Sequence, residues 1–127
     1  MGKGQAAVEI DKPTDQVWAV IGDFGGIGRW MPGIESCRVD GKDRILETMG
    51  MTITERLVST DDTAQTITYS VIDGAPVERH TATITVTPDG AGSLVRWEVD
   101  ATPDDMATVM ATIYQQALQA LKSHLEA

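Results

Sequence analysis

Basic side chains are scarce in this sequence, and their scarcity excludes two classes of partner. Lysine and arginine together number 10 among 127 residues, against 19 aspartates and glutamates, so the net charge is −9. Binding to nucleic acid or to an anionic lipid surface relies on clustered cations. No stretch of this chain holds three of them together. We therefore expect neither a nucleic-acid partner nor a membrane partner.

Cysteine and long apolar runs are also lacking. Cys37 is the only cysteine, which excludes an intrachain disulfide. The longest apolar runs fall far short of the ~20 residues that a membrane span needs, and the first residues lack the apolar segment of a secretory signal. The sequence therefore predicts a cytoplasmic protein, with residues 1–127 forming one globular domain.

Sites for metals and common cofactors are missing as well. The two histidines, His80 and His124, and Cys37 lie far apart along the chain, so we predict no metal site. The glycine-rich stretch 22–28 follows a predicted helix, not a strand, and lacks the spacing of a dinucleotide-binding loop. We accordingly expect no cofactor.

The hydrophobic periodicity at the two ends of the chain predicts three helical segments. A strand-like run over 5–11 precedes a short amphipathic helix over about 13–22, where Pro13 suits the first turn. The glycine-broken stretch 22–33 has room for one more helical turn. The last segment, about 103–126, carries a single apolar stripe at helical spacing.

Between these ends the period of the apolar residues becomes two. Turn signals divide this middle region into six predicted strands: 34–40, 43–49, 52–61, 65–73, 77–88 and 93–101. Short turns between consecutive strands favour an antiparallel meander. With the first strand this makes a seven-stranded sheet whose dry face the long helix covers. Curling of such a sheet leaves room for a cavity under the helix.

The chain also resembles a known superfamily. In order and spacing, two sets of its residues are similar to the helix-grip (START/SRPBCC) superfamily. The first set is Pro13, Val17-Trp18, Ile21, Asp23-Phe24, Trp30 and Pro32, and the second is Glu55-Arg56-Leu57, Tyr69 and Val95-x-Trp97. Within it, the polyketide cyclase/dehydrase-like branch is the most similar. The resemblance implies an α+β helix-grip fold, in which a curved seven-stranded sheet wraps around the C-terminal helix and two short helices separate strands one and two.

The resemblance also implies a function. Members bind small hydrophobic molecules such as polyketides, lipids or terpenoids under the C-terminal helix, and some are cyclases or dehydratases. Binding of such a ligand is our first interpretation, and an enzyme of the cyclase or dehydratase kind is the alternative. A third hypothesis, protein docking on the outer sheet face, is weakened by its threonine-rich pattern at Thr81, Thr83 and Thr85. We expect a monomer or a weak homodimer.

Strand register predicts which polar groups face the cavity. Glu55, Tyr69, His80 and Trp97 each share parity with the apolar residues of their strand, so they point at the dry face. In the enzyme hypothesis Glu55 or His80 takes a proton and Tyr69 hydrogen-bonds an enolate oxygen. Two alternatives stay open. In the first, these groups form a purely structural cluster. In the second, a slip of one residue in the strand register turns Glu55 to solvent and Arg56 inward.

The remaining candidate pocket residues come from two segments. The glycine-broken stretch contributes apolar side chains that need something to pack over, and the long helix contributes adaptable side chains on its apolar stripe. The predicted ligand pocket comprises Phe24, Trp30 and Met31 from the first segment, Trp97 from the sheet, and Met106, Met110, Ile113 and Tyr114 from the helix.

Overall fold

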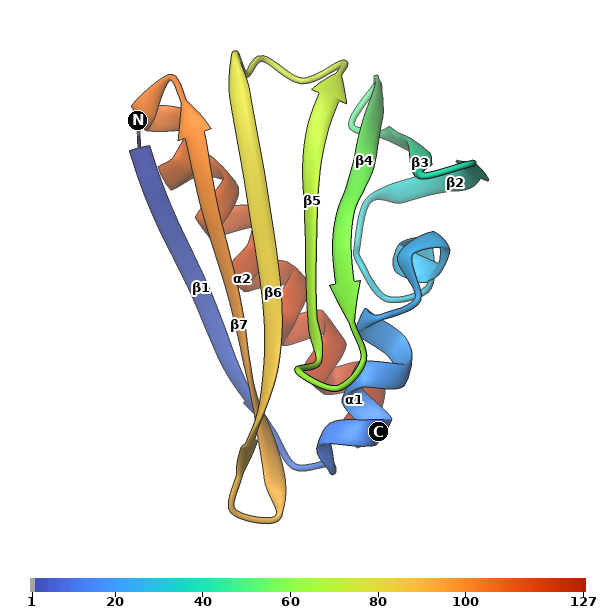
Figure 1. Ribbon diagram of the computed structural model, residues 1–127, viewed down its shortest axis with the longest axis vertical. Coiled ribbons are helices and arrows are strands. Elements are labelled where there is room, and N and C mark those ends of the chain that lie inside the picture. Colours follow the sequence, from blue (N-terminus) through green and yellow to red (C-terminus); the bar gives the residue numbers. More distant parts are fainter. Residues whose placement is uncertain (1) are drawn as a thin grey trace.

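The computed structural model describes residues 2–127 and contains the expected elements in the expected order (Figure 1). Seven strands and a long C-terminal helix enclose the core, and two short helical segments follow the first strand. The elements are β1 (Gly2–Ile10), α1 (Thr14–Ile21), the 3₁₀ helix η1 (Phe24–Arg29), β2 (Ile34–Asp40), β3 (Asp43–Thr48), β4 (Met51–Asp61), β5 (Thr66–Asp73), β6 (Arg79–Asp89), β7 (Gly92–Thr102) and α2 (Asp104–Glu126).

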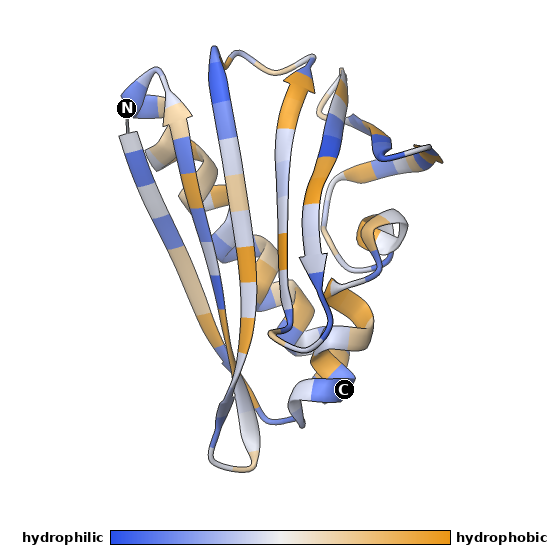
Figure 2. Cartoon of the chain, in the orientation of Figure 1, coloured by the Kyte–Doolittle hydropathy of each residue, from blue (hydrophilic) through white to orange (hydrophobic). Residues whose placement is uncertain are grey.

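The strands form one antiparallel sheet in the order β1-β7-β6-β5-β4-β3-β2, so β1 closes the meander beside the last strand. Apolar and polar residues alternate along the strands, which is visible as colour bands in Figure 2. On β6, Ala82, Ile84 and Val86 are buried while the threonines between them face outward. The sheet therefore has one apolar face, and α2 covers it.

The start of β1 allows α2 to approach the sheet closely. A Cβ atom at Gly4 would lie 2.5 Å from the carbonyl oxygen of Ala107, and one at Gly2 would lie 2.5 Å from that of Asp104. Only glycine fits at such distances. Because glycine has no apolar side chain, the apolar pattern predicted a strand that starts at residue 5, whereas the observed strand starts at Gly2.

A glutamine side chain fastens the helix to the sheet edge. The Gln115 amide donates to the carbonyl oxygen of Ala7 at 2.9 Å and accepts from the Ala7 N–H at 3.2 Å. These bonds satisfy backbone groups that an edge strand would otherwise leave open. With α2 held against β1 and β7, the apolar face of the strands beyond them is free to border a cavity.

The register settles the orientation of Glu55. Arg44 on β3 stands directly opposite Glu55 on β4, and both side chains are buried. Arg56 points to the outer face and makes an exposed, two-bond contact with Asp43. The alternative in which Arg56 turns inward is therefore excluded.

Candidate ligand-binding site

A mainly apolar cavity of about 110 Å³ lies between the sheet and α2. Its wall is formed by residues of η1, of β2 to β5, of β7 and of α2, together with residues of three connecting segments: Ile27, Met31, Ile34, Leu46, Thr48, Met49, Met51, Ile53, Glu55, Tyr69, Val71, Ala75, Pro76, Trp97, Met106, Val109, Met110, Ile113 and Tyr114. Met49 and Val109 are exposed members of this wall, and they mark the mouth of the cavity.

Methionine dominates the adaptable part of the wall. The sequence contains six methionines, and five of them line the cavity. An apolar cavity of ~150 Å³ holds benzene, so the cavity of about 110 Å³ present here is somewhat smaller than a one-ring ligand needs. Methionine has three rotatable bonds and fills irregular gaps. Rotation of these side chains can therefore enlarge the cavity for a longer apolar molecule.

The predicted pocket residues divide into two groups. The structure places Met31, Trp97, Met106, Met110, Ile113 and Tyr114 in the cavity wall. Phe24 and Trp30 are not part of it. The Phe24 ring lies over the Arg44 guanidinium, 4.0 Å from ring centroid to Cζ, and Trp30 packs on Trp97 with centroids 6.0 Å apart. These aromatic contacts hold both rings outside the cavity wall. From this part of the chain, the residues that line the cavity are Ile27 and Met31.

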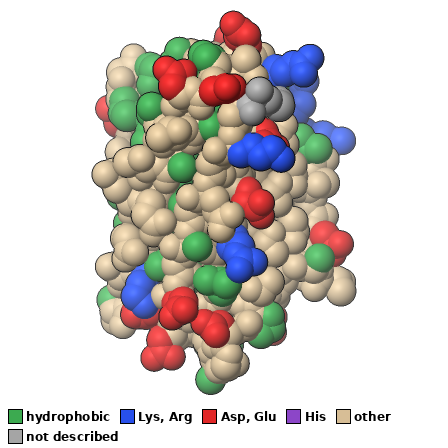
Figure 3. All heavy atoms as spheres, turned by 90° about the vertical axis from the view of Figure 1, so that its left-hand side faces the viewer, with side chains coloured by type: hydrophobic (Ala, Val, Ile, Leu, Met, Phe, Trp, Pro, Cys, Tyr) green, Lys and Arg blue, Asp and Glu red, His purple; other side chains and the backbone are tan. Residues whose placement is uncertain are grey.

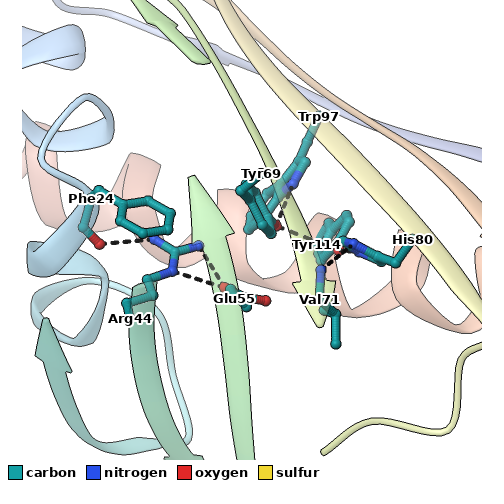
Figure 4. A network of polar contacts seen from close by, with 8 residues as sticks. All are labelled: Phe24, Arg44, Glu55, Tyr69, Val71, His80, Trp97 and Tyr114. Atoms are coloured by element: carbon teal, nitrogen blue, oxygen red, sulfur yellow. Dashed lines mark hydrogen bonds and ion pairs between the residues drawn. The ribbon is translucent and has the colours of Figure 1, made fainter. Parts of the chain in front are cut away.

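A buried ion pair borders the cavity on one side (Figure 4). Arg44 donates from Nε and Nη2 to the same Glu55 oxygen, Oε1, at 2.8 and 2.7 Å. Its Nη1 donates to the Phe24 carbonyl oxygen at 2.9 Å. The guanidinium also lies over the rings of Phe24 and Tyr69, with Cζ 4.0 and 4.8 Å from their centroids. The partner that a buried Glu55 requires is therefore Arg44, while the second carboxylate oxygen of Glu55 points away from it.

The second polar group is a chain of hydrogen bonds that joins the sheet to α2. The Trp97 Nε1–H donates to the Tyr69 hydroxyl at 3.1 Å, and that hydroxyl donates to Tyr114 at 3.5 Å. His80 Nε2 lies 3.1 Å from the Tyr114 hydroxyl, and His80 Nδ1 accepts the Val71 N–H at 3.0 Å. The rings of Trp97 and Tyr114 stack with centroids 3.9 Å apart. Tyr69 and Tyr114 line the cavity, whereas His80 stands behind them.

Burial keeps the members of this chain uncharged at neutral pH. It lowers the pKa of His80 from 6.5 to about 4. It raises the pKa of Tyr69 well above its usual value of 10.0, with a further contribution from the neighbouring Tyr114, and it also raises that of Tyr114. The tyrosine hydroxyls are therefore neutral, and the charged side chain of the cavity wall is Glu55, paired with Arg44 behind it.

The sequence reasoning missed Arg44, although a signal for it existed. Arg44 shares parity with Leu46 and Thr48 on β3, which are both buried. The methionines at 49 and 51 were also missed, because they stand in and beside a turn. Within residues 2–127, no group of three or more His, Cys, Asp or Glu side chains is placed to hold a metal ion. None of the helices there is long and apolar enough to cross a membrane.

Five large apolar side chains are exposed on the described part of the surface. The large apolar side chains that are exposed in the described part of the chain are Val39, Met49, Val58, Ile72 and Val109, and two of these belong to the cavity mouth. Figure 3 shows the side of the molecule at the β1 edge, where apolar side chains are scattered among charged ones. Two of these five side chains thus belong to the cavity, and the other three lie on β2, β4 and β5.

A curved seven-stranded sheet that grips a long C-terminal helix over a cavity is the helix-grip fold of START-like proteins. A START superfamily protein from Mycobacterium smegmatis has this fold, with a TM-score of 0.83 over 99% of this chain and 98% of its own, at 16% identity. The family model described as polyketide cyclase / dehydrase and lipid transport matches residues 1–126. The chain belongs to that family.

Two further solved structures are similar along the whole chain. The protein XoxI from Bacillus cereus is 33% identical, with a TM-score of 0.92 over 100% of this chain and 99% of its own. The di-domain ARO/CYC BexL from the BE-7585A biosynthetic pathway is 21% identical, with a TM-score of 0.83 over 99% of this chain and 47% of its own. Among curated proteins, none matches the chain.

Proposed function

We propose that this protein binds a small, largely apolar molecule, of polyketide, lipid or terpenoid kind, in the cavity under α2. The observation that carries the proposal is the wall itself, which is apolar, rich in methionine and open at an apolar mouth. Membership of a family whose description includes lipid transport and polyketide cyclases supports it. Preformed, mostly apolar cavities with a few polar groups are the usual sites of such ligands.

Native mass spectrometry of the purified protein tests this proposal directly. We expect a stoichiometric adduct that is lost on denaturation, and analysis of the organic extract identifies its class. The protein is also titrated with ethylbenzene, a neutral apolar probe of one ring, and its binding is followed by calorimetry. A bare polypeptide mass together with no binding of ethylbenzene would contradict the proposal.

A blocking substitution provides the matched variant. Ile113 faces the cavity from α2, so Ile113→Trp should fill the space and abolish both the adduct and the binding of ethylbenzene. Gln116→Trp adds the same side chain on the exposed face of the same helix and should leave binding unchanged. If both variants bind equally well, the ligand lies elsewhere on the protein.

The turn between β3 and β4 gives a second prediction. Met49 and Gly50 are its two central residues, with φ of 51° and 73°, and Met49 is 62% exposed at the cavity mouth. A non-glycine residue rarely adopts this left-handed conformation, whereas asparagine tolerates it well. We expect Met49→Asn to raise the free energy of unfolding by about 1 kcal/mol.

The same substitution should weaken binding. Met49→Asn removes an apolar side chain from the mouth, so we expect ethylbenzene to dissociate faster in stopped-flow measurements. Val58→Thr removes exposed apolar surface from β4 away from the cavity and should leave the dissociation rate unchanged. If Met49→Asn were more stable and bound ethylbenzene as wild type does, Met49 would have no part in retaining the ligand.

The second candidate function is that of a cyclase or dehydratase in the same cavity. It is favoured by Glu55, which lines the cavity together with Tyr69 and Tyr114. In this candidate Glu55 takes a proton next to a ligand carbonyl and a tyrosine stabilises the enolate oxygen. His80 acts through Tyr114, because its acceptor nitrogen is occupied by a backbone N–H. Conversion of the extracted ligand by wild type but not by Glu55→Gln would support this candidate.

A further inference from the structure

The tyrosine pair carries one more proton than its neighbours can accept. Five N–H and O–H groups meet in this network, those of Val71, His80, Trp97, Tyr69 and Tyr114, and they make four contacts. Each contact uses one proton. One proton is therefore left over, whichever way the contact between the two hydroxyls runs.

The tautomer of His80 determines where the surplus proton lies. Because Nδ1 accepts the Val71 N–H, the proton of the neutral ring must be on Nε2. His80 therefore donates to the Tyr114 oxygen, and Tyr69 donates to it as well. With two donors directed at its oxygen, the Tyr114 hydroxyl keeps a proton that has no acceptor in this network. The side chain that carries it lines the cavity.

We infer that Tyr114, oriented by His80, donates this proton to a hydrogen-bond acceptor of the bound molecule, and that the ligand is a neutral compound with a carbonyl or similar oxygen. This inference rests on the proposed binding function and adds to it the chemical class of the ligand. His80 is a positioning residue here, since it contacts the Tyr114 hydroxyl (Figure 4) and is not part of the cavity wall.

The other polar group in the wall excludes anionic ligands. The Glu55 carboxylate borders the same cavity, and its Oε1 takes both contacts from Arg44. Its second oxygen points away from Arg44 (Figure 4). The guanidinium is committed to Glu55 and to the Phe24 carbonyl oxygen. A carboxylate ligand would therefore meet repulsion from Glu55 instead of a free cation.

Three probes of similar size test the inference by calorimetry: acetophenone, which has a carbonyl acceptor, ethylbenzene, which has none, and benzoate, which is anionic. We expect Tyr114→Phe to weaken acetophenone binding about tenfold, the effect of one hydrogen bond in an apolar site. The affinity for ethylbenzene should change by less than about twofold, because the phenyl ring still stacks on Trp97. Benzoate should bind at least about tenfold more weakly than acetophenone.

Tyr69→Phe provides the comparison, because it removes a hydroxyl from the same network whose proton is already donated to Tyr114. It should weaken acetophenone binding by much less than Tyr114→Phe does. Unchanged acetophenone binding in Tyr114→Phe, or a loss confined to Tyr69→Phe, would overturn the inference. Retained ethylbenzene binding shows that each variant is folded and that its cavity is intact. Failure of wild type to bind either neutral probe would instead contradict the proposed function.

Discussion

Replacing Arg44 with methionine is expected to lower the free energy of unfolding by about 3–5 kcal/mol, the usual loss when one partner of a buried ion pair is removed. Arg44 is 4% and Glu55 8% exposed, and both guanidinium contacts go to one carboxylate oxygen. Without Arg44 the carboxylate is left buried and unpaired. The ring contacts of the guanidinium with Phe24 and Tyr69 are lost as well. Urea-induced unfolding, followed by tryptophan fluorescence, measures the effect.

Two variants separate the charge effect from a general loss of packing. Adding Glu55→Gln to Arg44→Met removes the unpaired charge, so the double variant should recover at least about 2 kcal/mol. Arg56→Met removes an arginine that has a similar carboxylate partner on the outer face of the sheet, and its loss should be much smaller. Equal losses for Arg44→Met and Arg56→Met would show that burial adds nothing to this pair.

The alternation of apolar residues was sufficient to predict the sheet. The β2 prediction has the bounds of the observed strand, and the starts and ends of the five strands after it agree within two residues. The reason is that side-chain period two is a strong signal wherever one face is buried. It also predicted that Glu55, Tyr69 and His80 point inward, and all three are buried. Local pattern and burial therefore carry most of this fold.

The contacts between strands could not be read in the same way. That Arg44 stands opposite Glu55 depends on the register of β3 against β4, which the turn at Met49 and Gly50 sets. That His80 reaches Tyr114 depends on where α2 lies, which the glycines of β1 determine. Both relations join distant parts of the chain, so no periodicity reveals them. Phe24 and Trp30 illustrate the same limit, because their aromatic partners come from other elements.

The stability of the protein should fall as the pH is lowered from about 6.5 to 4, and His80 should account for up to about 3 kcal/mol of the loss. Burial lowers the pKa of His80 from 6.5 to about 4, so the folded protein keeps the ring neutral throughout this range. The unfolded chain takes up the proton there. Because the unfolded state binds more protons than the folded state between pH 4 and 6.5, the free energy of unfolding rises with pH over that range. Above and below that range, the contribution of His80 does not change with pH.

His80→Gln tests this assignment, because an amide offers both an acceptor for the Val71 N–H and a donor for Tyr114 but does not titrate. The variant should lose distinctly less stability than wild type between pH 6.5 and 4, when both are unfolded by urea at a series of pH values. The pKa values of Asp43 and Glu126 are lowered by their partners, so the contribution of these two groups to the stability of the protein is lost mainly at lower pH. That loss is the same in the wild type and in the variant. The difference between the two curves therefore isolates His80. Parallel curves would mean that the folded protein takes up the His80 proton over the same pH range as the unfolded chain, and that burial does not keep the ring neutral.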